Sequence, residues 1–448
     1  MNSPSAVHHG AGHLTVVQGA ALYVGAVLGT GVIALPALAA EAAGPASLLA
    51  WLGLVLLSIP LAATFAALGA RFPDAGGVST YVRNAFGPRA AAVVGWCFYF
   101  AVPVGSPAAA MFGGAYAAAA FGGGQQTVII TAAALVLTVT AANLFGLQVS
   151  GRLQLVLAAL LVALLLAAVA VSVPHAHVTN LHPFAPHGWL AIWPAAALLV
   201  WSFAGWEAIT HLAGEFRHPQ RDLPLAAGIA VVIVGMLYLG IAGASVLVLG
   251  PAAGTSSAPL AELLALGIGG KVQVLAAAAA LLLTLGTMNA YYAGAAKLGA
   301  ALGRDGALPA WLAHGSRAGD VPRRSLAVVA GLSALALLAV TIAGVGPRPL
   351  VLLTTGSFVT VYALGTASAV RLLPRGSWAH WCALIALIAV AALCLATGWY
   401  LLWPLAITGC ALFYLQMRGR VVAVDRDAKN AAAQSGEKKR RKSGVSEA

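Results

Sequence analysis

Residues 201–207 read Trp-Ser-Phe-Ala-Gly-Trp-Glu and lie within an apolar run, residues 189–213, that is long enough to cross a bilayer. Placing a carboxylate at the centre of a membrane helix costs about 2.5–3.5 kcal/mol, so Glu207 needs a physical reason to be there. Gly205, two residues earlier, weakens the helix at the same depth. Backbone freed from a helix there is tolerated only where protein buries it or where it lines a wet cavity. The stretch therefore predicts an interrupted membrane helix beside a polar site.

The composition of the whole chain is that of a membrane protein. Its 448 residues are 61% hydrophobic and 8% charged, whereas soluble domains carry about 25% charged residues. The apolar runs are continuous, unlike the short alternating segments of a transmembrane β-barrel. The sequence therefore predicts an all-α polytopic membrane protein.

Apolar runs predict about twelve transmembrane helices. Their approximate ranges are 15–42, 47–70, 91–121, 126–146, 153–173, 190–214, 225–249, 271–299, 325–344, 349–371, 379–397 and 399–417. The first, third and eighth runs are longer than a straight crossing needs, so we expect breaks, tilt or interfacial extensions in them.

Lysine and arginine residues set the expected orientation. With the N-terminus in the cytoplasm, all but two of the 24 basic residues fall on the cytoplasmic side, the exceptions being Lys271 and Arg348. The net charge of +12 is then a topology signal, and we expect no nucleic-acid partner. The tail over residues 418–448, with Lys-Lys-Arg-Arg-Lys at 438–442, is predicted to be disordered and cytoplasmic, with contact to anionic lipids as the alternative.

Acidic, cysteine and histidine residues exclude several kinds of site. Of the twelve Asp and Glu residues only Glu207 lies deep within a predicted span, which leaves no paired carboxylates and no relay of acids. The four cysteines have no metal-ligand spacing and are interpreted as small buried hydrophobes. Four histidines in the loop over residues 174–189 are spaced irregularly, which favours a solvated loop over a metal site. We expect no metal and no cofactor.

A second interruption is predicted in the first span, where Gly25, Gly29 and Gly31 fall within seven residues. Each glycine weakens a helix by roughly 1 kcal/mol relative to alanine, and the half-helix that follows would present its N-terminal amides to an anion. Close helix packing through Gly25 and Gly29 is the alternative. Gly29 and Gly205 lie 176 residues apart, each in the first helix of a five-span block, so the second block is inverted. Interruptions at corresponding positions of two halves indicate a transporter site at the midplane.

These residues also resemble a family signature. Gly29-Thr30-Gly31 in the first span and Phe203-x-Gly205-x-Glu207 in the sixth resemble the amino acid–polyamine–organocation superfamily of transporters. Further matching segments are Phe72-Pro73-x-Ala75-Gly76-Gly77, the run from His211 to Pro224, and Arg304-Asp305-Gly306-x-Leu308-Pro309. Within the superfamily, residues 102–109 and 215–222 most resemble the bacterial exporter of methionine and branched-chain amino acids.

The resemblance implies a five-plus-five inverted repeat followed by two helices, in a multi-pass protein of a bacterial cytoplasmic (inner) membrane with both termini in the cytoplasm. The implied parts are a tail over 1–14, a first repeat over 15–173, an extracytoplasmic loop over 174–189, a second repeat over 190–371, helices 11 and 12 over 372–417, and the basic tail over 418–448.

The resemblance also implies residue roles. Backbone groups of Gly29–Gly31 would hold a substrate carboxylate, and the unwound backbone of 203–205 would receive the amino group. Trp201 matches an aromatic gate, with a lipid-facing or core tryptophan as the alternative. Glu207 matches a proton-sensing or gating carboxylate, with a structural hydrogen bond as the alternative. The predicted substrate-binding residues are Ala26, Gly29, Thr30, Gly31, Trp201, Phe203, Ala204, Gly205, Thr287 and Ser357, and further candidate lining residues are Met288, Asn289 and Phe358.

One intramembrane acid and no intramembrane base favour a neutral substrate: methionine, leucine, isoleucine or valine. We expect a secondary active exporter that works by alternating access with proton antiport, the proton carried by Glu207. An importer or exchanger of cationic amino acids or polyamines stays open, as does coupling to Na⁺ through hydroxyls such as Thr284 and Thr287. An intramembrane enzyme would need a nucleophile–base pair or a set of metal ligands. The sole candidate arrangement is His211, four residues after Glu207, and no third ligand accompanies it, so we expect no enzyme.

Overall fold

The computed structural model describes residues 14–72, 77–146, 151–207, 210, 213, 215–269, 272–316 and 320–418. Across these ranges the regular structure is helical, apart from a single β-bridge between Leu14 and Phe216. The predicted all-α class is therefore confirmed. The N-terminal tail before residue 14, the basic tail after residue 418 and His211 lie outside the described residues.

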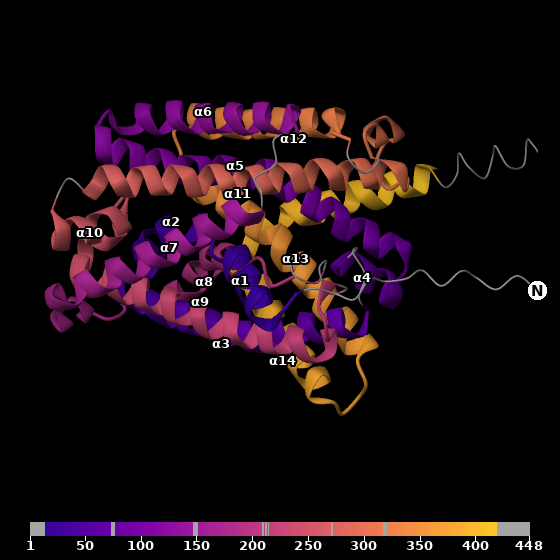
Figure 1. The fold of residues 1–448 in the computed structure, drawn as a ribbon, viewed down its shortest axis with the longest axis horizontal. Helices are drawn as coiled ribbons and strands as arrows, with labels where there is room; N and C mark the ends of the chain where they lie inside the picture. Colours follow the sequence, from indigo (N-terminus) through magenta and orange to yellow (C-terminus); the bar gives the residue numbers. More distant parts are fainter. Residues whose placement is uncertain are drawn as a thin grey trace, which may run out of the picture.

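The helices form a bundle in which two outer groups of helices enclose a central group. The α-helices are α1 (Val16–Val27), α2 (Gly31–Ala43), α3 (Ser47–Arg71), α4 (Val78–Phe86), α5 (Pro88–Phe121), α6 (Gly124–Leu144), α7 (Gly151–Ser172), α8 (Ile192–Phe203), α9 (Pro219–Leu249), α10 (Pro259–Ile268), α11 (Val272–Arg304), α12 (Arg323–Ile342), α13 (Arg348–Leu372), α14 (Trp378–Thr397) and a last helix over 402–418. Short 3-10 turns are η1 (Gly44–Ala46), η2 (Val173–His175), η3 (Val178–Leu181), η4 (Trp189–Ala191), η6 (Gly250–Gly254), η7 (Ala310–Ala313) and η8 (Gly398–Leu401). Figure 1 shows α5, α6, α11 and α12 along one side, α3, α9 and α14 along the other, and α1, α2 and α8 between them.

Membrane-length helices are plentiful in the described part of the chain. Nine stretches there are long and apolar enough to cross a bilayer, and two of them, Gly31–Arg71 and Trp378–Arg418, each contain a turn between two helices. Two shorter apolar helices, Val16–Val27 and Trp189–Phe203, belong to the two predicted spans in which interruptions were expected. The total of twelve crossings, the domain boundaries and the inverted repeat stay predictions.

The first predicted span is interrupted. α1 ends at Val27, Leu28 to Thr30 form a bend and turn, and α2 begins at Gly31. Of the three glycines, Gly25 lies within α1, Gly29 lies in the break, and Gly31 is the first residue of α2. The other two long runs stay helical, since α5 has 34 residues and α11 has 33, although Pro103 and Pro107 within α5 each remove one helical hydrogen bond.

The sixth predicted span is interrupted at Gly205. α8 ends at Phe203, and residues 204–207 form turns in which Gly205 has φ of +129°. A β-carbon at Gly205 would lie 2.7 Å from the carbonyl oxygen of Ala26, near the end of α1. The two breaks therefore pack directly against each other, which explains why a glycine stands at position 205.

Two short helices fall in segments that the sequence analysis treated as loops. α4 buries Val78, Tyr81, Val82 and Ala85 and packs against α5 and α13. α10 packs against α7, α11 and α2. Both are too short for a search based on spans of about 20 residues to find them.

Tyr116 of α5 fastens α10 over one end of α2. Its side chain is 1% exposed, and its hydroxyl donates to the carbonyl oxygen of Ile33 in α2 at 2.7 Å. The same hydroxyl accepts from the amide of Leu260, in the first turn of α10, at 3.2 Å. Three elements far apart in the sequence therefore meet at one side chain, close to the start of α2.

We expect Tyr116→Phe to lower the melting temperature of the purified protein. The change leaves the buried amide of Leu260 without its partner, and an unsatisfied buried polar group costs about 1–3 kcal/mol. Tyr23→Phe is the matched control, because the buried Tyr23 hydroxyl has no hydrogen-bond partner among the described residues. Equal losses of melting temperature in the two variants would contradict this role of Tyr116.

Candidate functional site

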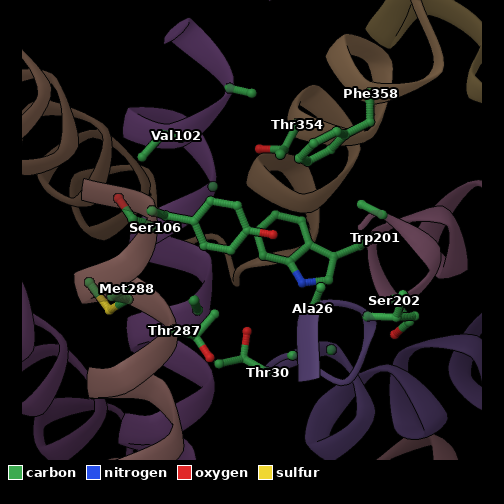
Figure 2. A pocket seen from close by; sticks show the side chains of 18 residues that line it. Ala26, Thr30, Val102, Ser106, Trp201, Ser202, Thr287, Met288, Thr354 and Phe358 are labelled. Atoms are coloured by element: carbon green, nitrogen blue, oxygen red, sulfur yellow. The ribbon is translucent and has the colours of Figure 1, made fainter. Parts of the chain in front are cut away.

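A cavity lies where the two breaks meet, and α5, α11 and α13 complete its wall (Figure 2). The space in it that the centre of a water molecule can occupy is about 50 Å³. This is room for a small solute or a few waters. Of the predicted substrate-binding residues, seven line it: Ala26, Gly29, Thr30, Gly31, Trp201, Ala204 and Thr287. The structure therefore brings together residues from the first, sixth and eighth predicted spans.

Three other predicted substrate-binding residues lie elsewhere. Phe203 is buried between Trp51 and Tyr238, with ring centroids at 6.0 and 5.0 Å. Gly205 packs on α1, as described above. Ser357 is wholly buried within α13 and does not line the cavity.

Of the further candidate lining residues, Met288 and Phe358 reach the cavity. Asn289 does not, and its Oδ1 accepts a hydrogen bond from Nδ2 of Asn143 in α6 at 2.7 Å. This pair joins α11 to α6 behind the cavity.

The sequence analysis named no lining residue in α5, although this helix forms part of the cavity wall. Its cavity residues are Ala101, Val102, Gly105, Ser106 and Ala109. Their spacing is that of one helical face, so periodicity could have grouped them once the inward face of this span was known. It also missed Thr354 of α13 and Tyr291 of α11, because polar residues on several faces of these helices leave the inward face undecided.

Trp201 occupies a slot that two glycines leave open. A β-carbon on Gly105 would lie 2.9 Å from Cη2 of the indole, and one on Gly31 would lie 2.8 Å from Cδ1. Phe112 packs edge-on against the ring at a centroid distance of 6.4 Å. Figure 2 shows the partly buried indole reaching from α8 toward the side of the cavity where Ser106 and Met288 lie. Trp201 is thus a wall of the cavity and not a lipid-facing residue.

Glu207 is tied to the backbone of the second break. Its side chain is 6% exposed, and Oε2 accepts from the Tyr362 hydroxyl at 2.6 Å and from the Gly205 amide at 3.1 Å. The carboxylate does not line the cavity. It contacts the turn at residues 204–207, of which Ala204 is a lining residue.

Tyr238 of α9 holds the carbonyl ends of both broken helices. Its hydroxyl lies 2.9 Å from the carbonyl oxygen of Val27 in α1 and 2.7 Å from that of Ser202 in α8. One hydroxyl proton is thus shared between the carbonyl oxygen of Ser202 and that of Val27, which also accepts from the Gly29 amide at 2.8 Å. This arrangement fixes the distance between the breaks.

The backbone gives the cavity two electrostatic poles. The N-terminus of α2, at Gly31, supplies partial positive charge, and the C-terminal ends of α1 and α8 supply partial negative charge. Within the described ranges, the cavity is lined by no charged side chain. A ligand with both an anionic and a cationic group, and no further charge, fits this field.

We expect Gly205→Ala to destabilise the protein. A side chain at φ of +129° is strained, and its β-carbon would press on the carbonyl of Ala26, so the loss should be about 1–3 kcal/mol. Gly228→Ala in α9 is the control, since a β-carbon there meets nothing within 4 Å and alanine favours a helix. Melting temperatures measure both changes, and an undiminished value for Gly205→Ala would refute the close contact between the breaks.

Comparison with known proteins agrees with this geometry. The family model described as amino acid permease matches residues 14–423. An uncharacterized amino acid permease of Bacillus subtilis, YecA, is 33% identical over 406 residues, which are 91% of this chain and 96% of that protein. The L-methionine/branched-chain amino acid exporter YjeH of Escherichia coli is 37% identical over 231 residues, 51% of this chain and 54% of that protein. An uncharacterized transporter of Mycobacterium tuberculosis is 29% identical over 365 residues, 80% of each chain. The chain therefore belongs to the amino acid permease family of the amino acid–polyamine–organocation superfamily, and it is a membrane transporter and not an enzyme.

Proposed function

We propose that this permease exports neutral amino acids with aliphatic or thioether side chains, namely methionine, leucine, isoleucine and valine, in exchange for protons. The observation that carries the substrate class is the absence of any charged side chain from the cavity wall in the described part of the chain. The exporter from Escherichia coli, which matches half of this chain, supports both the substrate class and the direction.

The two poles of the cavity suit the two charged groups of such a substrate. The carboxylate belongs at the N-terminus of α2, and the ammonium group at the carbonyl ends of α1 and α8. The side chain then meets the apolar wall of α5, with Val102 and Ala109, and Phe358 of α13. A neutral amino acid thereby leaves no charge without a partner.

A cationic amino acid or a polyamine fits this arrangement less well. Its extra positive charge would need a carboxylate in the cavity wall, and the nearest candidate, Glu207, is turned toward Tyr362 and Gly205. Burying that charge without a partner is strongly unfavourable. We therefore place import or exchange of cationic substrates second.

The shape of the bundle supports alternating access with the cavity facing inward. Tyr116 and α10 close the end of the bundle that we assign to the outside. On α11, Tyr291 lines the cavity one turn further toward the end that we assign to the inside than Thr287. An exporter must load its substrate from the cytoplasm in such a state. Both termini are then cytoplasmic, in a bacterial inner membrane.

Proton coupling is assigned to Glu207. In the carboxylate form, Oε2 accepts hydrogen bonds from the Gly205 amide and the Tyr362 hydroxyl. Protonation would remove the negative charge from this acceptor and so weaken the hydrogen bonds from the Gly205 amide and the Tyr362 hydroxyl. Because Gly205 packs on the carbonyl of Ala26, a change of protonation reaches both breaks. The proton would enter from outside as the amino acid leaves.

A flux panel tests the substrate and the driving ion. The purified protein is reconstituted in liposomes with radiolabelled methionine, leucine, isoleucine, valine, arginine or putrescine, under separately imposed pH and Na⁺ gradients. We expect saturable flux of the four neutral amino acids that a pH gradient drives and a Na⁺ gradient does not. Strong flux of arginine or putrescine without flux of the neutral amino acids would overturn the substrate class.

Glu207→Gln tests the proton role separately. The glutamine amide oxygen can still accept from Tyr362 and Gly205, but the side chain no longer binds a proton. We expect exchange of labelled for unlabelled methionine to persist, while flux driven by the pH gradient falls roughly a hundredfold or more, in the range typical of a lost proton-transfer group. Glu262→Gln is the control, because that carboxylate accepts from the Ser256 hydroxyl in the α10 region, away from the cavity. Full flux driven by the pH gradient in Glu207→Gln would exclude this residue as the proton carrier.

A further inference from the structure

The hydroxyl of Ser202 is an unpaired polar group in the cavity wall. Ser202 is 2% exposed, lines the cavity, and its Oγ has no hydrogen-bond partner in the described part of the chain. Several other buried hydroxyls on helices donate to the carbonyl four residues earlier, as Ser245 does to Ile241 and Thr354 does to Leu350, both at 2.8 Å. Two further serine and threonine hydroxyls without a partner in the described residues, those of Thr355 and Ser357, do not line the cavity. Buried polar groups are nearly always paired, so an orphaned hydroxyl in a ligand cavity points to a ligand.

Ser202 faces the first turn of α2. A β-carbon on Gly31, the first residue of α2, would overlap Oγ of Ser202. The first amides of any helix lack intrahelical acceptors, and the residue that precedes this helix, Thr30, makes no side-chain hydrogen bond to them. Donors from α8 and from α2 therefore converge on one place. The glycine at position 31 keeps that place open.

An acceptor with negative charge satisfies these donors. The N-terminus of α2 favours an anion and disfavours an ammonium group. The backbone carbonyl of Ser202 is already bonded to the Tyr238 hydroxyl, so it is the side-chain hydroxyl that is left to serve a ligand. A carboxylate oxygen can accept from the hydroxyl and from the α2 amides together.

We propose that Ser202 donates a hydrogen bond to the carboxylate of the transported amino acid, at the N-terminus of α2. The inference rests on the proposed function, since it takes the substrate to be an amino acid bound in this cavity. The carboxylate then joins α8 to α2, which are halves of two different interrupted spans. Ser202 thus discriminates amino acids from amines and amides that lack the carboxylate.

The test is a binding measurement on full-length protein in detergent, by competition with radiolabelled methionine. Wild type, Ser202→Ala and Ser245→Ala are each titrated with methionine and with methioninamide, which keeps the ammonium group and the side chain. We expect Ser202→Ala to weaken methionine binding roughly tenfold, as loss of a hydrogen bond to a charged group does. Its effect on methioninamide should be several-fold smaller. Ser245→Ala removes a hydroxyl already bonded to the carbonyl of Ile241 and should bind both ligands as wild type does.

Two results would overturn the role of Ser202: unchanged methionine affinity in Ser202→Ala, or equal losses for methionine and methioninamide. If wild type binds no methionine, that result contradicts the proposed function alone. The comparison is then made with the amino acid that the flux panel identifies and with its amide. The two proposals can thus fail separately.

Discussion

Backbone polar groups inside a membrane must find partners within the protein, and the centre of this bundle is arranged around that constraint. Breaking the two helices takes the carbonyl groups of Val27 and Ser202 and the amide of Gly205 out of regular helical pairing. Tyr238 shares its hydroxyl between the two carbonyl groups, and Glu207 with Tyr362 takes the amide. In the described part of the chain the hydroxyl of Ser202 has no partner, and we propose that it and the first amides of α2 bind the substrate. The cavity is therefore the place where the pairing of the backbone is incomplete.

Close approach of backbone and rings depends on glycine at a few positions. Gly205 lets the second break lie on the carbonyl of Ala26, and Gly31 with Gly105 leaves the slot in which Trp201 lies. Any side chain at these places would separate the breaks or move the indole. The glycines thus fix the shape of the cavity, while the tyrosines and Glu207 fix its polarity. In the proposed function, the substrate site, the proton site and the two helix breaks depend on the same few groups.

Sequence reasoning located the breaks because their causes are local. A carboxylate in an apolar run and glycines clustered in another can be read without any knowledge of neighbours. It did not separate the residues that line the cavity from those that support it. Phe203 and Ser357 stand next to lining residues in the sequence, yet one packs on Trp51 and Tyr238 and the other is buried inside α13. The orientation of a residue about an apolar helix depends on which helices surround it, and hydropathy in a membrane carries little of that information.

By itself, then, the sequence determined the all-α membrane class, the two interruptions and the family, since composition, run length and local motifs carry these properties. Only the tertiary structure decided that Glu207 supports the turn at Gly205 and does not face the cavity, that α5 supplies a wall, and that Tyr116 fastens α10 over α2. Each of these depends on side chains that meet from segments far apart in the chain. Tyr362 and Glu207 are 155 residues apart, and Tyr116 and Leu260 are 144 apart. No local pattern encodes such a meeting, because the packing of the whole bundle sets the distance between them.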